Sequence, residues 1–203
     1  MEEDNGRLQQ ITHTFKSQII ILGGFILALW IIEGVDWLIF GGSLDQFGIR
    51  PRSIAGLWGI LFAPLLHGNF QHLMANTVPL FVLGWLVLST RRVQTFLKVT
   101  AIIVLISGLG TWLIGPRLSV HLGASGLIFG YLSFLLLVGY FERSFRSIAL
   151  AVVVFFIYGG LIWGILPLVE GVSWQAHLFG FIGGGIAASQ IGEQLSIKIH
   201  DSY

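Results

Sequence analysis

An apolar run, GASGLIFGYLSFLLLVGY (residues 123–140), opens on Ser125, a serine set among glycines. A hydroxyl at lipid depth usually bonds back to the carbonyl oxygen four residues earlier, which would give Ser125 a purely structural role. A second apolar run, with the same orientation in the chain, also opens on a polar residue, His177. Two runs with the same orientation place their first residues at the same side of the membrane, so the Ser125 and His177 side chains can be in contact. This possibility weakens the purely structural interpretation of Ser125.

The composition indicates a membrane protein. Of the 203 residues, 55% are hydrophobic and 10% are charged, whereas soluble domains are about one-quarter charged. A span needs roughly 20 mostly apolar residues, so the chain has room for six short-looped spans in the lipid bilayer. A net charge of +1 without a basic block gives no indication of a nucleic-acid partner. The absence of cysteine excludes disulfides and thiolate metal sites.

The apolar runs predict an all-α membrane protein with six transmembrane helices. The expected spans cover residues 18–40, 71–89, 93–114, 123–140, 148–166 and 174–191. Glycine and proline break residues 41–70 too often for a straight span, but this segment is rich in aromatic residues, which settle at membrane interfaces. We therefore expect an interfacial first loop. The predicted organisation is a polar cytoplasmic tail at 1–17, a membrane domain at 18–191 and a second cytoplasmic tail at 192–203.

The distribution of lysine and arginine predicts the orientation. Eight of these residues fall on the side of the two termini and three on the other, which puts both termini in the cytoplasm. The small size of the chain and the lack of an organelle-targeting leader favour a bacterial inner membrane as the location of this multi-pass protein.

The second, fourth and sixth spans all enter the membrane from the outer face. Each carries polar residues in its opening turns: His72 and Asn76, then Ser125, then His177. At about 1.5 Å of rise per residue, these groups lie at one depth within the outer third of the bilayer. Ionisable groups inside a membrane are costly and mark functional sites that face the bundle interior.

Small residues at every fourth position predict that the fourth and sixth spans pack closely. The repeat comprises Gly126 and Gly130 on one span and Ala176, Gly180, Gly184 and Ala188 on the other. Such faces let helix backbones approach each other in lipid. Ser125 and His177 each adjoin one of these faces, so a close crossing would bring hydroxyl and imidazole within hydrogen-bond reach.

This arrangement is typical of nucleophilic catalysis. A serine becomes a good nucleophile when a base takes its proton, and neutral histidine suits that role near pH 7. No carboxylate lies at the same depth, so we expect a Ser125–His177 pair without a third member. Candidate donors for an oxyanion are the Ser125 backbone N–H, the His72 imidazole and the Asn76 amide, the last two on one helix face.

Three segments carry a family resemblance. They are HGNFQHLMAN (residues 67–76), GASG (residues 123–126) and AHLFGFIGG (residues 176–184), and together they resemble the signature motifs of rhomboid intramembrane serine proteases over roughly residues 19–190. The resemblance implies a six-helix bundle with Ser125 as nucleophile and His177 as general base. His72, Asn76 and the Ser125 amide would hold the oxyanion, without a cofactor. Substrates would be transmembrane proteins cut near the outer face, with water entering through a cavity that opens outward.

Two positions depart from the family pattern. Many members carry Trp-Arg in the first loop, where this chain has Trp58 and Gly59. Many bacterial members place a tyrosine four residues after the serine, stacked on the catalytic histidine. Phe129 stands there in this chain, which keeps a stacking surface but removes the hydroxyl.

Other interpretations stay open at this point. Rhomboid-like pseudoproteases keep the bundle but have lost the serine or the histidine, and they act as non-enzymatic binding factors. The presence of both Ser125 and His177 in this chain argues against that class. A channel or transporter would place polar residues at mid-membrane and show inverted repeats, and neither pattern is visible. A metal site built from His67, His72 and His177 would lack an acidic ligand, and we expect none. We interpret His67 as a hydrogen bonder that orders its loop and His121 as an interfacial residue.

Overall fold

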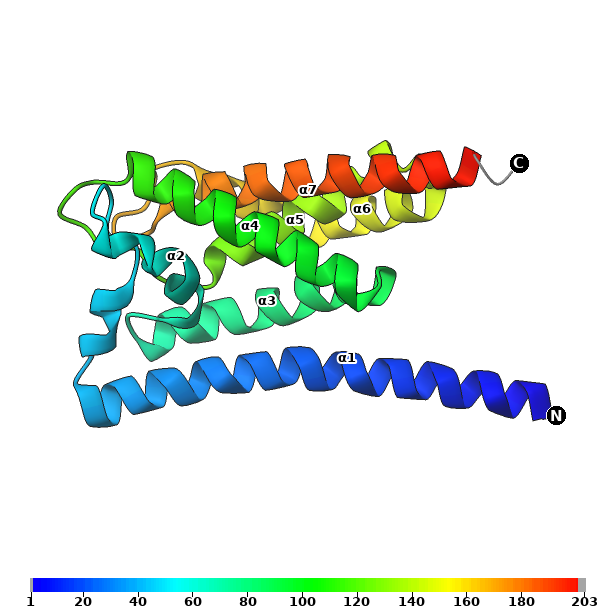
Figure 1. Ribbon diagram of the computed structural model, residues 1–203, viewed down its shortest axis with the longest axis horizontal. Coiled ribbons are helices and arrows are strands. Elements are labelled where there is room, and N and C mark those ends of the chain that lie inside the picture. Colours follow the sequence, from blue (N-terminus) through cyan, green and yellow to red (C-terminus); the bar gives the residue numbers. More distant parts are fainter. Residues whose placement is uncertain (1, 201–203) are drawn as a thin grey trace.

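The computed structural model describes the backbone of residues 2–200 and the side chains of residues 15–194. Six long helices run up and down in this region (Figure 1): α1 (Glu2–Val35), α3 (Phe70–Thr90), α4 (Val93–Ile114), α5 (Ser125–Phe141), α6 (Phe145–Tyr158) and α7 (Trp174–His200). Within the described residues there is no strand, only an isolated bridge between Ile49 and His121. The prediction of an all-α helical bundle is confirmed.

Short helical pieces make up the connections. They are a π-helix at Asp36–Phe40, 3₁₀ turns at Ser43–Phe47, Ala55–Leu57 and Ala63–Leu65, the short α2 (Gly59–Phe62), and a 3₁₀ segment at Gly159–Ile165 that follows α6. Most of them gather at the end of the bundle where α3, α5 and α7 begin, on the left of Figure 1.

Four segments are long and apolar enough to cross a membrane: Phe15–Phe40, Phe70–Thr90, Val93–Ile114 and Phe145–Ile165. Helix α5 is apolar but has only 17 residues. Nearly all of its side chains are buried, and it packs against α3, α4, α6 and α7. It is therefore the central helix of the bundle, while α1 lies at the periphery against α3 (Figure 1).

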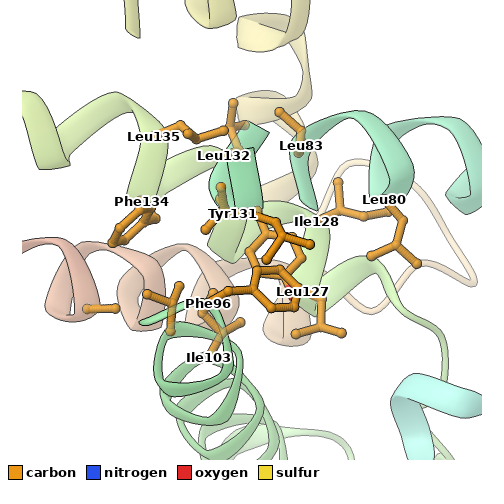
Figure 2. Packing of buried hydrophobic residues seen from close by; sticks show 14 of the residues in the cluster. Leu80, Leu83, Phe96, Ile103, Leu127, Ile128, Tyr131, Leu132, Phe134 and Leu135 are labelled. Carbon is orange, nitrogen blue, oxygen red and sulfur yellow. The ribbon is translucent and has the colours of Figure 1, made fainter. Parts of the chain in front are cut away.

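The core is a single apolar cluster around α5 (Figure 2). Leucines of α3 and α5 meet Phe96 and Ile103 of α4 there, and the Phe96 and Tyr131 rings stack with their centroids 5.7 Å apart. The Tyr131 hydroxyl shares a hydrogen bond of 2.8 Å with Thr100 Oγ1, so the one polar atom of that ring is satisfied. Because lipid tails are as apolar as these side chains, close packing rather than burial from water holds the helices together.

Helices α5 and α7 touch backbone to backbone. A Cβ atom added to Gly180 would collide with the carbonyl oxygen of Gly126, and one added to Gly184 would collide with that of Gly130. The two pairs lie one helical turn apart along the contact. The lack of a side chain at Gly180 and Gly184 therefore sets the distance between the two helices. A Cβ atom on Gly126 or Gly130 would instead collide with α4, at Ser107 and Ile103 respectively.

The first loop has exposed aromatic side chains and a firm attachment to α4. Trp37, Phe47, Trp58 and Phe62 are all exposed, as an interfacial segment requires. Arg52 holds the loop: its guanidinium donates hydrogen bonds of 2.7 and 2.6 Å to the carbonyl oxygens of Leu113 and Gly115. A cation suits this position, because the carbonyl groups at the end of α4 carry partial negative charge.

The close approach of the first-loop backbone explains why position 59 is a glycine. A Cβ atom there would overlap the carbonyl group of Gly48 and the backbone nitrogen of Ile49, so no side chain fits. The arginine that many members of the resembled family carry after Trp58 is thus sterically excluded here. Arg52, seven residues earlier, ties the loop down instead.

We expect Gly59→Arg to destabilise the protein, although it introduces the residue that many family members carry. Overlap with backbone atoms, which cannot rotate away, should lower the free energy of unfolding by about 3 kcal/mol. The measurement is thermal unfolding in detergent, with Gly68→Arg in the same loop as control, because a Cβ at Gly68 meets only ordinary contacts of 3.7 Å to Asp45 Oδ2 and 3.8 Å to Leu122 Cδ1. A Gly59→Arg protein as stable as the control would contradict this account of the loop.

Helix α1 begins at Glu2 and α7 ends at His200, so both helices extend into the predicted tails, residues 1–17 and 192–203. The side chains of residues 1–14 and 195–203 lie outside the described part of the chain. The assignment of these segments as cytoplasmic tails stays a prediction.

Candidate active site

The predicted site residues come from three helices that begin at the same end of the bundle. His72 and Asn76 lie in the opening turns of α3, Ser125 is the first residue of α5, and His177 lies in the first turn of α7. Figure 1 shows these three helix starts beside the short elements of the first loop, away from the two labelled chain ends. The structure therefore brings all four residues to one end of the molecule.

Two contacts fix the His177 ring. The Phe129 ring stacks on it, with centroids 4.1 Å apart and planes inclined by 7°. On the ring edge, Nδ1 lies 2.9 Å from the carbonyl oxygen of Gly164. A carbonyl oxygen can only accept, so Nδ1 carries the proton in a neutral ring and Nε2 carries the lone pair. This is the tautomer that a general base needs.

Gly164 is a site residue that the sequence analysis missed. It belongs to the 3₁₀ segment Gly159–Ile165, and a Cβ on it would come within 2.7 Å of the Phe129 ring and 3.4 Å of His177 Nδ1. Its backbone carbonyl orients the histidine, a role often given to a carboxylate. A backbone acceptor leaves no mark on residue type, so no sequence signal could have identified it.

Ser125 is 8% exposed and opens α5, four residues before Phe129. One helical turn thus separates the serine from the ring that stacks on His177. Among the described residues no hydrogen bond joins the Ser125 hydroxyl to the His177 ring. Such bonds are often long before substrate binds and tighten in the complex. The Ser125 N–H precedes the first helical hydrogen bonds and donates to no other residue in the described part of the chain.

His72 and Asn76 face the turn that precedes Ser125. Gly123 has φ of +112°, and a Cβ on it would lie 2.6 Å from His72 Cε1 and 3.6 Å from Asn76 Nδ2. Glycine is required there by both the backbone conformation and the lack of space. Asn76 is 6% exposed, and its Nδ2 is buried without a hydrogen-bond partner in the described part of the chain. A buried donor of this kind is costly unless a ligand uses it.

His67 also contacts the turn that precedes Ser125. Its Nε2 accepts a hydrogen bond of 3.4 Å from the Ala124 N–H, and its ring lies edge-on to His72 with centroids 5.2 Å apart. Burial, with a smaller effect of His72, lowers the pKa of His67 to about 4, which keeps the ring neutral and able to accept. No group of three or more potential metal ligands occurs among residues whose placement is described.

His121 has a structural role that the sequence analysis did not anticipate. The side chain of this residue, which the sequence analysis interprets as interfacial, is buried within the protein, at 8% exposure. Its two ring nitrogens hydrogen-bond the hydroxyl groups of Ser119 and Ser173, each at 2.7 Å. Its backbone also exchanges two hydrogen bonds with Ile49 of the first loop. His121 therefore connects the first loop to the segment that begins α7.

The link from His121 continues to the candidate base. The Ser173 carbonyl oxygen accepts a hydrogen bond of 3.2 Å from the His177 N–H, and Ser107 Oγ of α4 donates one of 2.8 Å to the Ala176 carbonyl. The first turn of α7 is thus attached to two neighbouring segments. A cavity of about 20 Å³, lined in part by Gly123 and Gly126, adjoins this region and has room for one water molecule.

Comparison with known proteins identifies the family. The Rhomboid domain family model matches residues 55–193. An uncharacterized protein of Mycobacterium tuberculosis is 47% identical over 190 residues, which cover 87% of this chain and 78% of that protein. RHOMBOID-like protein 5 of Arabidopsis thaliana is 34% identical over 70% of this chain and 44% of its own length. Rhomboid protease GluP of Bacillus subtilis is 31% identical over 82% of this chain and 33% of its own length. This chain belongs to the rhomboid family of integral membrane proteins.

Proposed function

We propose that this protein is an intramembrane serine endopeptidase that cleaves transmembrane protein substrates. In this proposal Ser125 is the nucleophile and His177 the general base. The reaction takes place near the outer face of the membrane, with both chain termini in the cytoplasm and the protein in a bacterial inner membrane. The name of the Bacillus relative and the arrangement of the site residues support this assignment.

The chemistry follows from the groups at the site. Ser125 Oγ attacks the carbonyl carbon of the substrate peptide bond while its proton passes to His177 Nε2. The negative charge that develops on the carbonyl oxygen is stabilised by the Ser125 N–H, His72 and the free Nδ2 of Asn76. His177 then gives its proton to the leaving amine, and an acyl-enzyme remains. A water molecule, deprotonated by His177, hydrolyses that ester and restores the serine.

The observation that carries the proposal is the fixed orientation of the His177 ring. Its contacts with Phe129 and the Gly164 carbonyl favour the tautomer with a free Nε2, and Phe129 stands one helical turn after Ser125. A histidine that served only packing would not need both a stacked ring and a defined hydrogen-bond acceptor. In the unliganded enzyme these contacts fix the base in advance, which lowers the cost of reaching the transition state.

The test is labelling by a fluorophosphonate probe, which forms a bond from an activated serine oxygen to phosphorus and releases fluoride. We expect the purified protein to become labelled in a detergent or lipid environment, and the Ser125→Ala variant to remain unlabelled. Equal labelling of both proteins would show that another nucleophile reacts. No labelling of the wild-type protein under conditions that label another rhomboid protease would favour the non-enzymatic alternative, a membrane-protein binding factor.

A further inference from the structure

A groove lies at the end of the bundle opposite the candidate active site. It occupies about 500 Å³ between the α3–α4 turn and the last described residues of α7. Arg91, Arg92, Thr95 and Lys98 line one side and Gln194 lines the other. No acidic side chain is among the residues that line it, within the part of the chain whose side chains are described.

The cations of this groove differ in their partners. Arg91 is neutralised: it forms a salt bridge of 3.0 Å with Glu142 and lies over the Phe134 ring, 5.8 Å from its centroid. Arg92 and Lys98 are exposed, and neither makes a side-chain hydrogen bond or ion pair with another described residue. The groove therefore presents two positive charges that no described side chain neutralises, beside hydrogen-bonding side chains, and this is the chemistry that binds phosphate.

An apolar stripe continues from the groove along α4. Gln94 and Lys98 line the groove, and the same face of the helix continues with the apolar Ala101 and Leu105; all four are exposed. Leu109, one turn further, is exposed as well. A ligand in the groove can thus place a charged group between the cations and an apolar chain along α4, which a free inorganic anion cannot do.

We propose that this groove binds the headgroup phosphate of an anionic phospholipid, with one acyl chain lying along the exposed face of α4. Basic pockets between transmembrane helices at the membrane surface are suited to such headgroups. A zwitterionic lipid would bring its own cation toward Arg92 and Lys98, so the groove discriminates by net charge. The site is independent of the proposed catalytic residues, which lie at the other end of the molecule.

The test is lipid titration of the delipidated full-length protein, followed by native mass spectrometry. Phosphatidylglycerol is the anionic probe and phosphatidylcholine the zwitterionic one. Each cation near an anionic lipid contributes about five-fold in affinity, so Arg92→Gln/Lys98→Gln should weaken phosphatidylglycerol binding by about 25-fold. We expect weak phosphatidylcholine binding in both proteins. The same lipid affinities are expected when the measurement is repeated with the Ser125→Ala variant. The result of the lipid titration therefore does not depend on proteolytic activity.

The matched control is Arg143→Gln/Arg146→Gln, which removes the same charge from the α5–α6 turn and the first turn of α6, at the same end of the bundle. This control should keep wild-type affinity. An equal loss in both double variants would mean attraction to surface charge in general and would overturn the proposal, as would unchanged affinity in the groove variant. Displacement of phosphatidylglycerol by millimolar inorganic phosphate would make the ligand a free anion and would also overturn it. The melting profile of each variant checks that the fold is intact.

Discussion

Alanine in place of Ser125 or His177 is expected to lower the rate of substrate cleavage by at least about 10⁴-fold. Without the hydroxyl there is no nucleophile, and without the imidazole no group at the site takes the proton from it. Because the two residues act as one unit, the double variant should be no slower than either single variant. If the rate reductions of the two single variants multiplied in the double variant, the two side chains would act independently. That result would contradict a catalytic Ser125–His177 pair.

The measurement is cleavage of a transmembrane reporter by protein reconstituted in lipid vesicles. Ser133→Ala is the matched control, because Ser133 lies two turns deeper on α5 and is fully buried, and its hydroxyl has no hydrogen-bond partner among the described residues. Removing an unsatisfied buried hydroxyl should cost little or nothing, so Ser133→Ala should cleave at the wild-type rate. Wild-type cleavage by the Ser125→Ala variant would end the protease assignment.

Alanine at Gly180 is expected to reduce cleavage about 10²-fold, and alanine at Gly184 to act in the same direction. The added methyl group would collide with the carbonyl oxygen of Gly126 or Gly130, respectively, so α7 must move away from α5. Gly180 lies one turn after His177, and a displacement of about 1 Å at a catalytic group costs about 10²-fold in rate. Leucine at either position should have a larger effect.

The control for this prediction is the neighbouring Gly185. A Cβ on Gly185 would lie 3.4 Å from Leu137 Cδ1 and 3.5 Å from Ser133 Oγ, which is ordinary van der Waals contact. Gly185→Ala changes the same residue type on the same helix and should retain activity within about two-fold. Comparing kcat for the three alanine variants separates the effect of helix displacement from that of losing a glycine. Equal rates in all three would show that the contact does not position His177.

Much of the fold could be predicted because each transmembrane helix satisfies its own backbone hydrogen bonds. In lipid, an apolar run of sufficient length must be helical, so the six runs located the long helices. The exceptions are the extensions of α1 and α7 into the tails and the fifth run, where α6 ends at Tyr158 and a 3₁₀ segment follows. The glycine spacing predicted which faces of α5 and α7 would touch, and the structure has Gly126 against Gly180 and Gly130 against Gly184. Helical periodicity is a local property that sequence displays directly.

Contacts made by backbone atoms could not be predicted in this way. The carbonyl of Gly164 that accepts from His177 belongs to a short 3₁₀ segment, and any residue type offers the same acceptor. The exclusion of a side chain at position 59 depends on the path of Gly48 and Ile49, a loop whose course no periodicity specifies. The side-chain partners of His121 could not be predicted either, since the two serines come from separate loops.

The sequence by itself determined that this chain is a helical membrane protein and which polar residues open its buried helices. Apolar run length and the spacing of small residues are local features, and the bilayer permits few structures that satisfy them. Only the tertiary structure decided how the candidate base is oriented, what replaces the missing loop arginine, and where two cations have no partner among the residues whose side chains are described. Those outcomes depend on hydrogen bonds and close approaches between segments far apart in the chain, which exist only once the helices are packed.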